Sequence, residues 1–204
     1  MFDFIKTLWI AGGANRLTVI ACALLIGTAT VGTIYGIVVR PGDVSFMQRD
    51  GHELQWDKVD MPIACYFEAD LPALHRQTTL RVIASLNNAV GPKLFGPCFD
   101  WQIGVPLKTP DGSVWLKIRT ERKEHAGATT THRYDKRTGR ILSAQVALDS
   151  QLNAEDLEKV MLHELGHVLG LDHDREKGSI MYESLTRRSS QLSSRDLKAL
   201  KETY

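Results

Sequence analysis

Residues 163–173 read HELGHVLGLDH and place three histidines, one glutamate and one glycine in an ordered spacing. His163 and His167 are four residues apart, so on a helix they lie one turn apart on the same face. Gly170 lets that helix end, because glycine adopts left-handed backbone conformations at low cost. The chain can then turn back and present His173. The spacing therefore predicts that three imidazoles converge on one point.

Three imidazole nitrogens at one point are predicted to bind a single Zn²⁺ and to leave its fourth coordination position open. An open position is typical of a catalytic zinc site, whereas a structural site is closed by protein ligands. Glu164 follows the first histidine, and we expect it to act as the general base on a metal-activated water without binding the metal. The predicted reaction is hydrolysis of a peptide bond.

The segment GSIMY, residues 178–182, places Met181 where it could form an apolar floor beneath the three imidazoles. Together with the histidine run, it resembles the Met-turn of the metzincin zinc metallopeptidases, and its Met-Tyr order is most similar to the matrixin catalytic domain. This resemblance implies a zincin-like mixed twisted sheet with an active-site helix. Glu183 stands where matrixins usually carry a proline, and Tyr182 is not assigned as a metal ligand.

The remaining periodicity predicts an α+β class of fold. Strands are expected over 62–67, 99–105, 114–120 and 141–148, helices over 74–90 and 154–169, a final helix from Ser193 or Ser194, and either a strand or an exposed loop over 127–134. Asn153 is a good N-cap for the histidine-bearing helix. By resemblance to the metzincins, 141–148 would be the edge strand above the cleft, where an extended peptide could pair with free backbone groups.

Residues 17–39 contain no charged side chain and are long enough, as a helix, to cross a hydrocarbon core of about 30 Å. We interpret this run as one transmembrane helix. A cleaved signal peptide with a small-residue site at 27–29 is the rival interpretation. The predicted organisation is an N-terminal flank (1–16), a transmembrane helix (17–39), a juxtamembrane linker (40–58) and a metzincin-like zinc peptidase domain (59–204). Flanking charges lean slightly towards an extracytoplasmic domain.

The formal charge of +1, from 25 basic and 24 acidic residues, gives no sign of a nucleic-acid partner. His52, His75, His125 and His132 lack ligand-like spacing, so one zinc per chain is predicted. Matrixins often bind calcium as well, but no motif for it is visible, and the sequence does not predict an oligomeric state. Cys65 and Cys98 could form a disulfide, remain as buried thiols, or supply a thiolate that blocks the zinc.

The leading hypothesis is a membrane-anchored zinc-dependent endopeptidase acting on protein or peptide substrates. Two alternatives remain at this point. One is a non-catalytic zinc-containing module that binds peptides, which would not need a base at Glu164. The other is an amidase acting on cell-wall peptides, whose hydrolytic centre would have the same residues.

Overall fold

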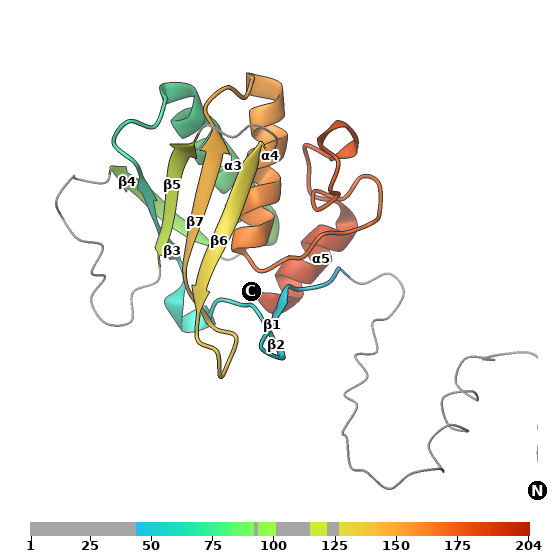
Figure 1. Ribbon diagram of the computed structural model, residues 1–204. Helices are drawn as coiled ribbons and strands as arrows, with labels where there is room; N and C mark the ends of the chain where they lie inside the picture. The colour runs from blue at the N-terminus through green and yellow to red at the C-terminus, as the bar shows by residue number, and fades with distance from the viewer. Residues whose placement is uncertain (1–43, 92–93, 101–114, 122–126) are drawn as a thin grey trace, which may run out of the picture. The chain divides into compact units, whose positions relative to one another are not determined.

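The computed structural model describes residues 44–91, 94–100, 115–121 and 127–204. Within them, helices pack on a mixed sheet, which is compatible with the predicted α+β class. The sheet has strand order β4-β3-β5-β7-β6. Its strands are β3 (Ile63–Phe67), β4 (Phe95–Asp100), β5 (Trp115–Glu121), β6 (Ala128–Tyr134) and β7 (Ile141–Asp149). β4, β3, β5 and β7 run parallel, and β6 is antiparallel to β7 (Figure 1).

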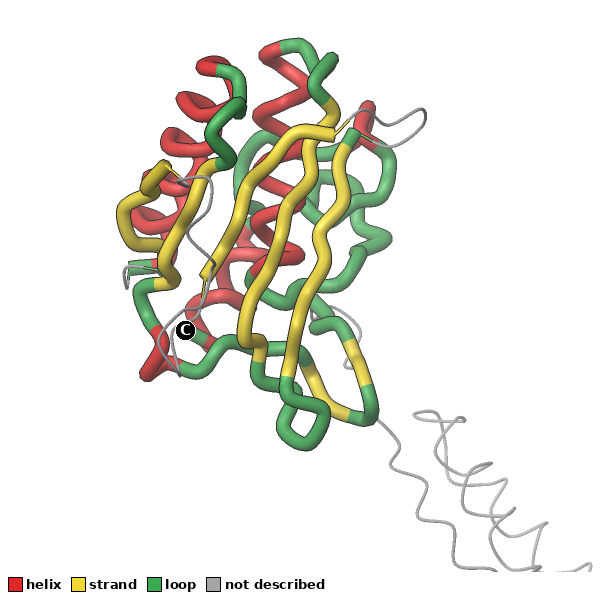
Figure 2. The backbone as a smooth tube through the Cα atoms, turned by 60° about the vertical axis from the view of Figure 1, so that its left-hand side comes forward, coloured by secondary structure: helices red, strands yellow, loops and turns green. Residues whose placement is uncertain are grey.

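Two long helices, α3 (Ala73–Val90) and α4 (Ala154–Val168), lie against one face of the sheet (Figure 2). α4 contacts β6, β7 and α3, while a shorter helix, α5 (Ser194–Thr203), contacts α3. The core between the layers is apolar, with Met161 and Leu165 of α4 and Val146 of β7 fully buried. Burial of this apolar area is the main force that holds α4 on the sheet.

The described sheet has β4 at one edge and β6 at the other, so the prediction that 141–148 forms an edge is wrong. β7 pairs with β5 on one side and with β6 on the other. Its side chains are buried along most of its length, as expected of a strand with a neighbour on each side. The threonine-rich segment 127–134, which the sequence left open between strand and loop, forms the edge strand β6.

Residues predicted as a juxtamembrane linker belong in part to the core. Leu54 and Trp56 are buried, and Trp56 Nε1 donates a 2.6 Å hydrogen bond to the carbonyl of Val168 at the end of α4. This segment also forms β1 (Gln48–Arg49), β2 (His52–Glu53) and the 3₁₀ helix η1 (Lys58–Asp60). Burial of these two apolar side chains stabilises the fold. The folded domain therefore includes residues before position 59.

The predicted membrane span, residues 17–39, lies outside the described residues. None of the helices within the described part is long and apolar enough to cross a membrane. Of the three alternatives for Cys65 and Cys98, the structure shows the disulfide. Cys65 of β3 and Cys98 of β4 are register partners on adjacent strands and are covalently bonded.

Candidate metal centre and cleft

α4 places the first two histidines. Asn153 caps the helix by accepting a 2.9 Å hydrogen bond from the backbone N–H of Asp156, and acidic residues in the first turn favour the positive end of the helix dipole. His163 and His167 then lie one turn apart, as their spacing predicts. α4 ends at Val168, and Gly170 follows with φ of 90°, a left-handed conformation that turns the chain back.

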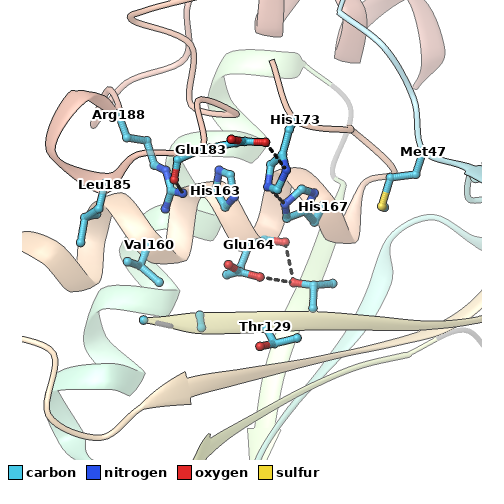
Figure 3. A pocket seen from close by; sticks show the side chains of 13 residues that line it. Met47, Thr129, Val160, His163, Glu164, His167, His173, Glu183, Leu185 and Arg188 are labelled. Atoms are coloured by element: carbon cyan, nitrogen blue, oxygen red, sulfur yellow. Dashed lines mark hydrogen bonds and ion pairs between the residues drawn. The ribbon is translucent and has the colours of Figure 1, made fainter. Parts of the chain in front are cut away.

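The third histidine converges with the other two. One ring nitrogen from each of His163, His167 and His173 lies within 4.8 Å of the other two, and the Nε2 atoms of His167 and His173 are 3.1 Å apart (Figure 3). The predicted trio is therefore brought together in the fold, with two members from a helix and one from the loop after it.

Backbone carbonyls fix the orientation of two of these rings. The Nδ1 of His163 is 2.8 Å from the carbonyl oxygen of Ile180, and the Nδ1 of His167 is 2.8 Å from that of Leu171. A carbonyl only accepts, so each Nδ1 carries the proton and each Nε2 keeps a lone pair. Such hydrogen bonds are the usual support of histidines that bind metals. The donor set therefore fits a zinc ion bound through imidazole nitrogens.

The surroundings keep the imidazoles of His163 and His167 neutral. Burial, followed by the nearby His167, lowers the pKa of His163 to about 2. Burial also lowers the pKa of His167 to about 4, although its hydrogen bond to Leu171 opposes the change. Only a neutral imidazole has a lone pair for a metal, so both rings are in the binding-competent form at neutral pH without prior loss of a proton.

Glu164 points its carboxylate into the same cleft, and its side chain is held from the edge strand. The residue is only 6% exposed, and the hydroxyl of Thr130 on β6 donates a 2.6 Å hydrogen bond to its Oε2. The predicted base thus sits beside the metal centre in a fixed orientation (Figure 3). Sequence reasoning missed Thr130, since a threonine in a threonine-rich strand carries no signal of this contact.

The segment that contains Met181 lies close against α4. Met181 is fully buried, and a Cβ atom added at Gly166 would collide with its Sδ. Gly166 therefore permits a contact that any larger residue would obstruct, which explains a glycine inside a helix that it weakens by about 1 kcal/mol. That Met181 also forms an apolar floor beneath the three imidazoles stays a prediction.

Asp196 joins this segment to the C-terminal helix. Its fully buried carboxylate accepts hydrogen bonds from the hydroxyl of Ser179 at 2.7 Å and from the backbone N–H of Ile180 at 3.1 Å. Since the Ile180 carbonyl in turn accepts from His163, the side chain of Asp196 supports a histidine of the metal centre through one intervening residue. The sequence analysis did not single out this residue. Its N3 position in a capping box that begins at Ser193 was the available signal.

The centre opens into a cleft of about 570 Å³. The walls come from α4, β6 and the segment after Met181, and Met47 also contributes. The lining residues are Met47, Gly127, Ala128, Thr129, Thr130, Val160, His163, Glu164, His167, His173, Glu183, Leu185 and Arg188. His132, whose ring Nε2 lies 3.0 Å from the His167 carbonyl, supports α4 from the strand and is not part of the histidine trio.

Comparison with known proteins agrees with the fold and the metal centre. The family model for matrixins matches residues 101–204, half of the chain, and the chain therefore belongs to the matrixin family. It is 34% identical over 84 residues to Metalloendoproteinase 1 of Glycine max, a match that covers 39% of this chain and 28% of that protein. It is 42% identical over 62 residues to Metalloendoproteinase 2-MMP of Arabidopsis thaliana, covering 28% of this chain and 16% of that protein.

Proposed function

We propose that this chain is a zinc-dependent endopeptidase that hydrolyses peptide bonds in protein or peptide substrates. One observation carries the proposal: three imidazoles converge beside the buried carboxylate of Glu164 in a cleft that is open to solvent. A purely structural zinc site would not need a carboxylate in that place, which argues against a non-catalytic peptide-binding module. The matrixin family and the two named metalloendoproteinases support the same reaction class.

Different residues of the site have different proposed roles. His163, His167 and His173 would bind the metal, which when bound supplies the Lewis acidity that activates water and polarises the substrate carbonyl. Glu164 accepts the proton of the attacking water and passes it to the leaving amine. Thr130 holds one oxygen of Glu164, so the carboxylate is already oriented before substrate arrives.

The edge strand supplies a place for the substrate backbone. Within the described sheet, β6 pairs with β7 on one side and forms the edge of the sheet on the other. Residues 127–130 at this edge line the cleft opposite α4. An extended peptide that pairs with this edge would lie across the metal centre, which is how sheet edges commonly hold peptides.

A matched pair of variants tests the proposal. The zinc-loaded chain should contain one zinc per molecule by metal analysis and should cleave members of a peptide library in a chelator-sensitive reaction. Glu164→Ala should keep the zinc and lower cleavage by about 10²–10⁴-fold, the usual contribution of general acid–base catalysis. Glu155→Ala, at an exposed position in the first turn of the same helix, should change neither quantity. Cleavage undiminished in Glu164→Ala would refute the assignment.

Residues 17–39 are proposed to anchor the domain in a membrane with the cleft on the extracytoplasmic side. The support is the uncharged run itself, flanked by Arg16 and Arg40. Protease protection of intact membranes tests it. Digestion of the domain by external protease is expected, and full protection would contradict this orientation. A chain released from membranes without residues 1–29 would favour the signal peptide.

A further inference from the structure

On one side of the histidines, the lining of the cleft includes one basic side chain. Val160, one turn before His163 on α4, lines this part together with Leu185 and Arg188. The latter two come from the 3₁₀ helix η2 (Leu185–Arg187) and the residue after it. In Figure 3 these three side chains gather on one side of the histidines, while Met47 lies on the other. The pocket thus has apolar walls and a guanidinium group.

Two backbone carbonyls fix the guanidinium of Arg188. Its Nε donates a 2.9 Å hydrogen bond to Tyr182, and its Nη2 donates a 2.9 Å hydrogen bond to Glu183. The side chain is half-buried, and this burial lowers the pKa of Arg188 while the carboxylate of Glu164 raises it. An arginine stays protonated in proteins, so the pocket holds a positioned and partly desolvated cation.

The carboxylates near this cation are engaged elsewhere. Glu183 is 78% exposed at its side chain, and its Oε1 lies 3.6 Å from Nδ1 of His173 (Figure 3). Glu164 accepts the hydroxyl of Thr130. Within the described part of the chain, no acidic side chain comes within ion-pair distance of Arg188. The hydrogen bonds of the Arg188 guanidinium thus go to two backbone carbonyls, while the Glu164 carboxylate acts on its charge from beyond ion-pair distance.

We propose that Arg188 makes this pocket select substrates that place a carboxylate in it, next to the bond that is cleaved. The inference rests on the proposed endopeptidase function and adds a substrate class to it. Val160 and Leu185 contact the methylene part of an entering acidic side chain, and the guanidinium pairs with its carboxylate through charge-assisted hydrogen bonds. The carboxylate can come from a glutamate or aspartate side chain, or from the C-terminus of a short peptide.

Peptide pairs that differ in one group test the selection and distinguish the two sources. The first pair carries Glu or Gln beside the scissile bond, on each side in turn, with both ends of the peptide blocked. The second pair is a neutral peptide that ends in a free acid or an amide just beyond that bond. The carboxylate member of one pair should be cleaved with about tenfold higher kcat/KM, since a charge-assisted hydrogen bond contributes at least that factor. Equal kcat/KM within both pairs would overturn the proposal.

A substitution with a matched neighbour separates selection from structural support. Arg188→Met should reduce the preferred pair's ratio to about one, and Arg188→Lys should retain part of it, because the charge persists without the planar fork. Arg187→Met removes the same charge from an exposed position and should leave the ratio unchanged. If Arg188 only supported the segment after Met181, Arg188→Met would slow both peptides alike and preserve the ratio, which would refute selection.

A binding measurement makes the result independent of turnover. The dissociation constants of the same blocked peptides are measured on the zinc-loaded Glu164→Gln chain, with and without Arg188→Met. The carboxylate peptide should bind about tenfold more tightly, and only when Arg188 is present. Failure to cleave any peptide would reject the proposed function, whereas equal dissociation constants would reject the carboxylate pocket.

Discussion

The two walls of the cleft are encoded in different ways. The helix wall, α4 with the chain that follows it to Tyr182, carries the three histidines, Glu164 and Met181 in one continuous stretch of sequence. The strand wall, β6, reaches the helix wall through Thr130 and His132, which lie 34 and 35 residues before their partners Glu164 and His167. Groups expected to do the chemistry thus lie on one wall, and groups that orient them lie on the other.

Sequence spacing is more informative for the helix wall than for the strand wall. A helix fixes the relative positions of residues four apart, so the sequence of the helix wall alone predicts how its side chains are arranged. A strand fixes only which residues share a face, and its partner across a cleft depends on the tertiary fold. A strand-wall residue whose loss weakens zinc binding as much as the loss of a histidine of the trio would contradict this assignment of roles.

The largest expected effect comes from exchanging one histidine on each wall. His173→Ala should weaken zinc binding by well over 100-fold, because it removes a ligand of the proposed centre. His132→Ala removes a ring that contacts the carbonyl of His167 and should weaken binding by about tenfold at most, the lower end of the range for outer supporting groups. Competition against a chromophoric chelator measures both affinities. Equal losses would show that the two walls share the ligand set.

The next effect concerns the turn that presents His173. An added Cβ at Gly170, where φ is 90°, would collide with the backbone carbonyl oxygen of the buried Leu54. We expect Gly170→Ala to lower the free energy of unfolding by about 3 kcal/mol or more, because strain and collision with backbone combine. Urea denaturation followed by circular dichroism measures the change.

Gly91→Ala is the control for that substitution. Its φ is 102°, yet no atom lies within 4 Å of an added Cβ, so it reports the cost of the backbone conformation alone. That cost should be about 1–2 kcal/mol. If both variants lose the same stability, the collision with Leu54 contributes nothing, and the helix wall does not depend on the segment that was predicted to be a linker.

Much of the fold could be predicted from local signals. The Asn153 cap and the Gly170 stop bound α4 to within a residue, because capping and glycine chemistry act locally, and the helix expected over 74–90 is found as α3. The edge of the sheet was assigned to the wrong strand. A run such as 141–148 predicts a strand, but strand order is set by pairing between distant segments.

The same reasoning explains what was missed in the site. The histidine trio follows from the spacing within one short segment. Thr130, Arg188 and Asp196 lie on a sheet edge, in a loop and on the terminal helix, far from that segment's own spacing pattern. Each of these residues is ordinary in its own stretch of sequence. Leu54 and Trp56 were assigned to a linker because the charges around them hid two isolated core residues.

A pH titration of the metal-free chain tests whether the two buried histidines of the helix wall, His163 and His167, affect stability. The folded pKa values of about 2 for His163 and about 4 for His167 lie below the unfolded value of 6.5, so the unfolded chain binds more protons as pH falls below 6.5. Stability should therefore decrease from pH 6.5 downwards and stay nearly constant above it. The slope approaches about 1.4 kcal/mol per pH unit for each group.

Denaturant midpoints between pH 7.5 and 5 measure this slope, and that range lies above the main titration of carboxylates. The double variant His163→Gln/His167→Gln should flatten the curve, because it removes both groups. A slope unchanged in the double variant would assign the acid sensitivity to other residues, including His132, whose pKa is also lowered by burial.

The smallest expected effect tests the strand wall directly. Thr130→Val keeps the shape of the side chain but removes the hydroxyl that donates to Glu164 Oε2. The carboxylate then loses one charge-assisted hydrogen bond and part of its fixed orientation. We expect kcat to fall about tenfold with KM little changed, because the contact orients the base and does not bind substrate. Zinc content should remain at that of the unmodified chain.

Two controls decide whether Thr130 acts through Glu164. Thr130→Ser restores a hydroxyl and should recover most of the lost kcat, while Thr131→Val, at an exposed position next along β6, should leave kcat unchanged. A loss in Thr130→Val that serine fails to rescue would mean that the strand packs against α4 and nothing more. In that case, the helix wall alone would orient the base, and the orienting role assigned to the strand wall would be wrong.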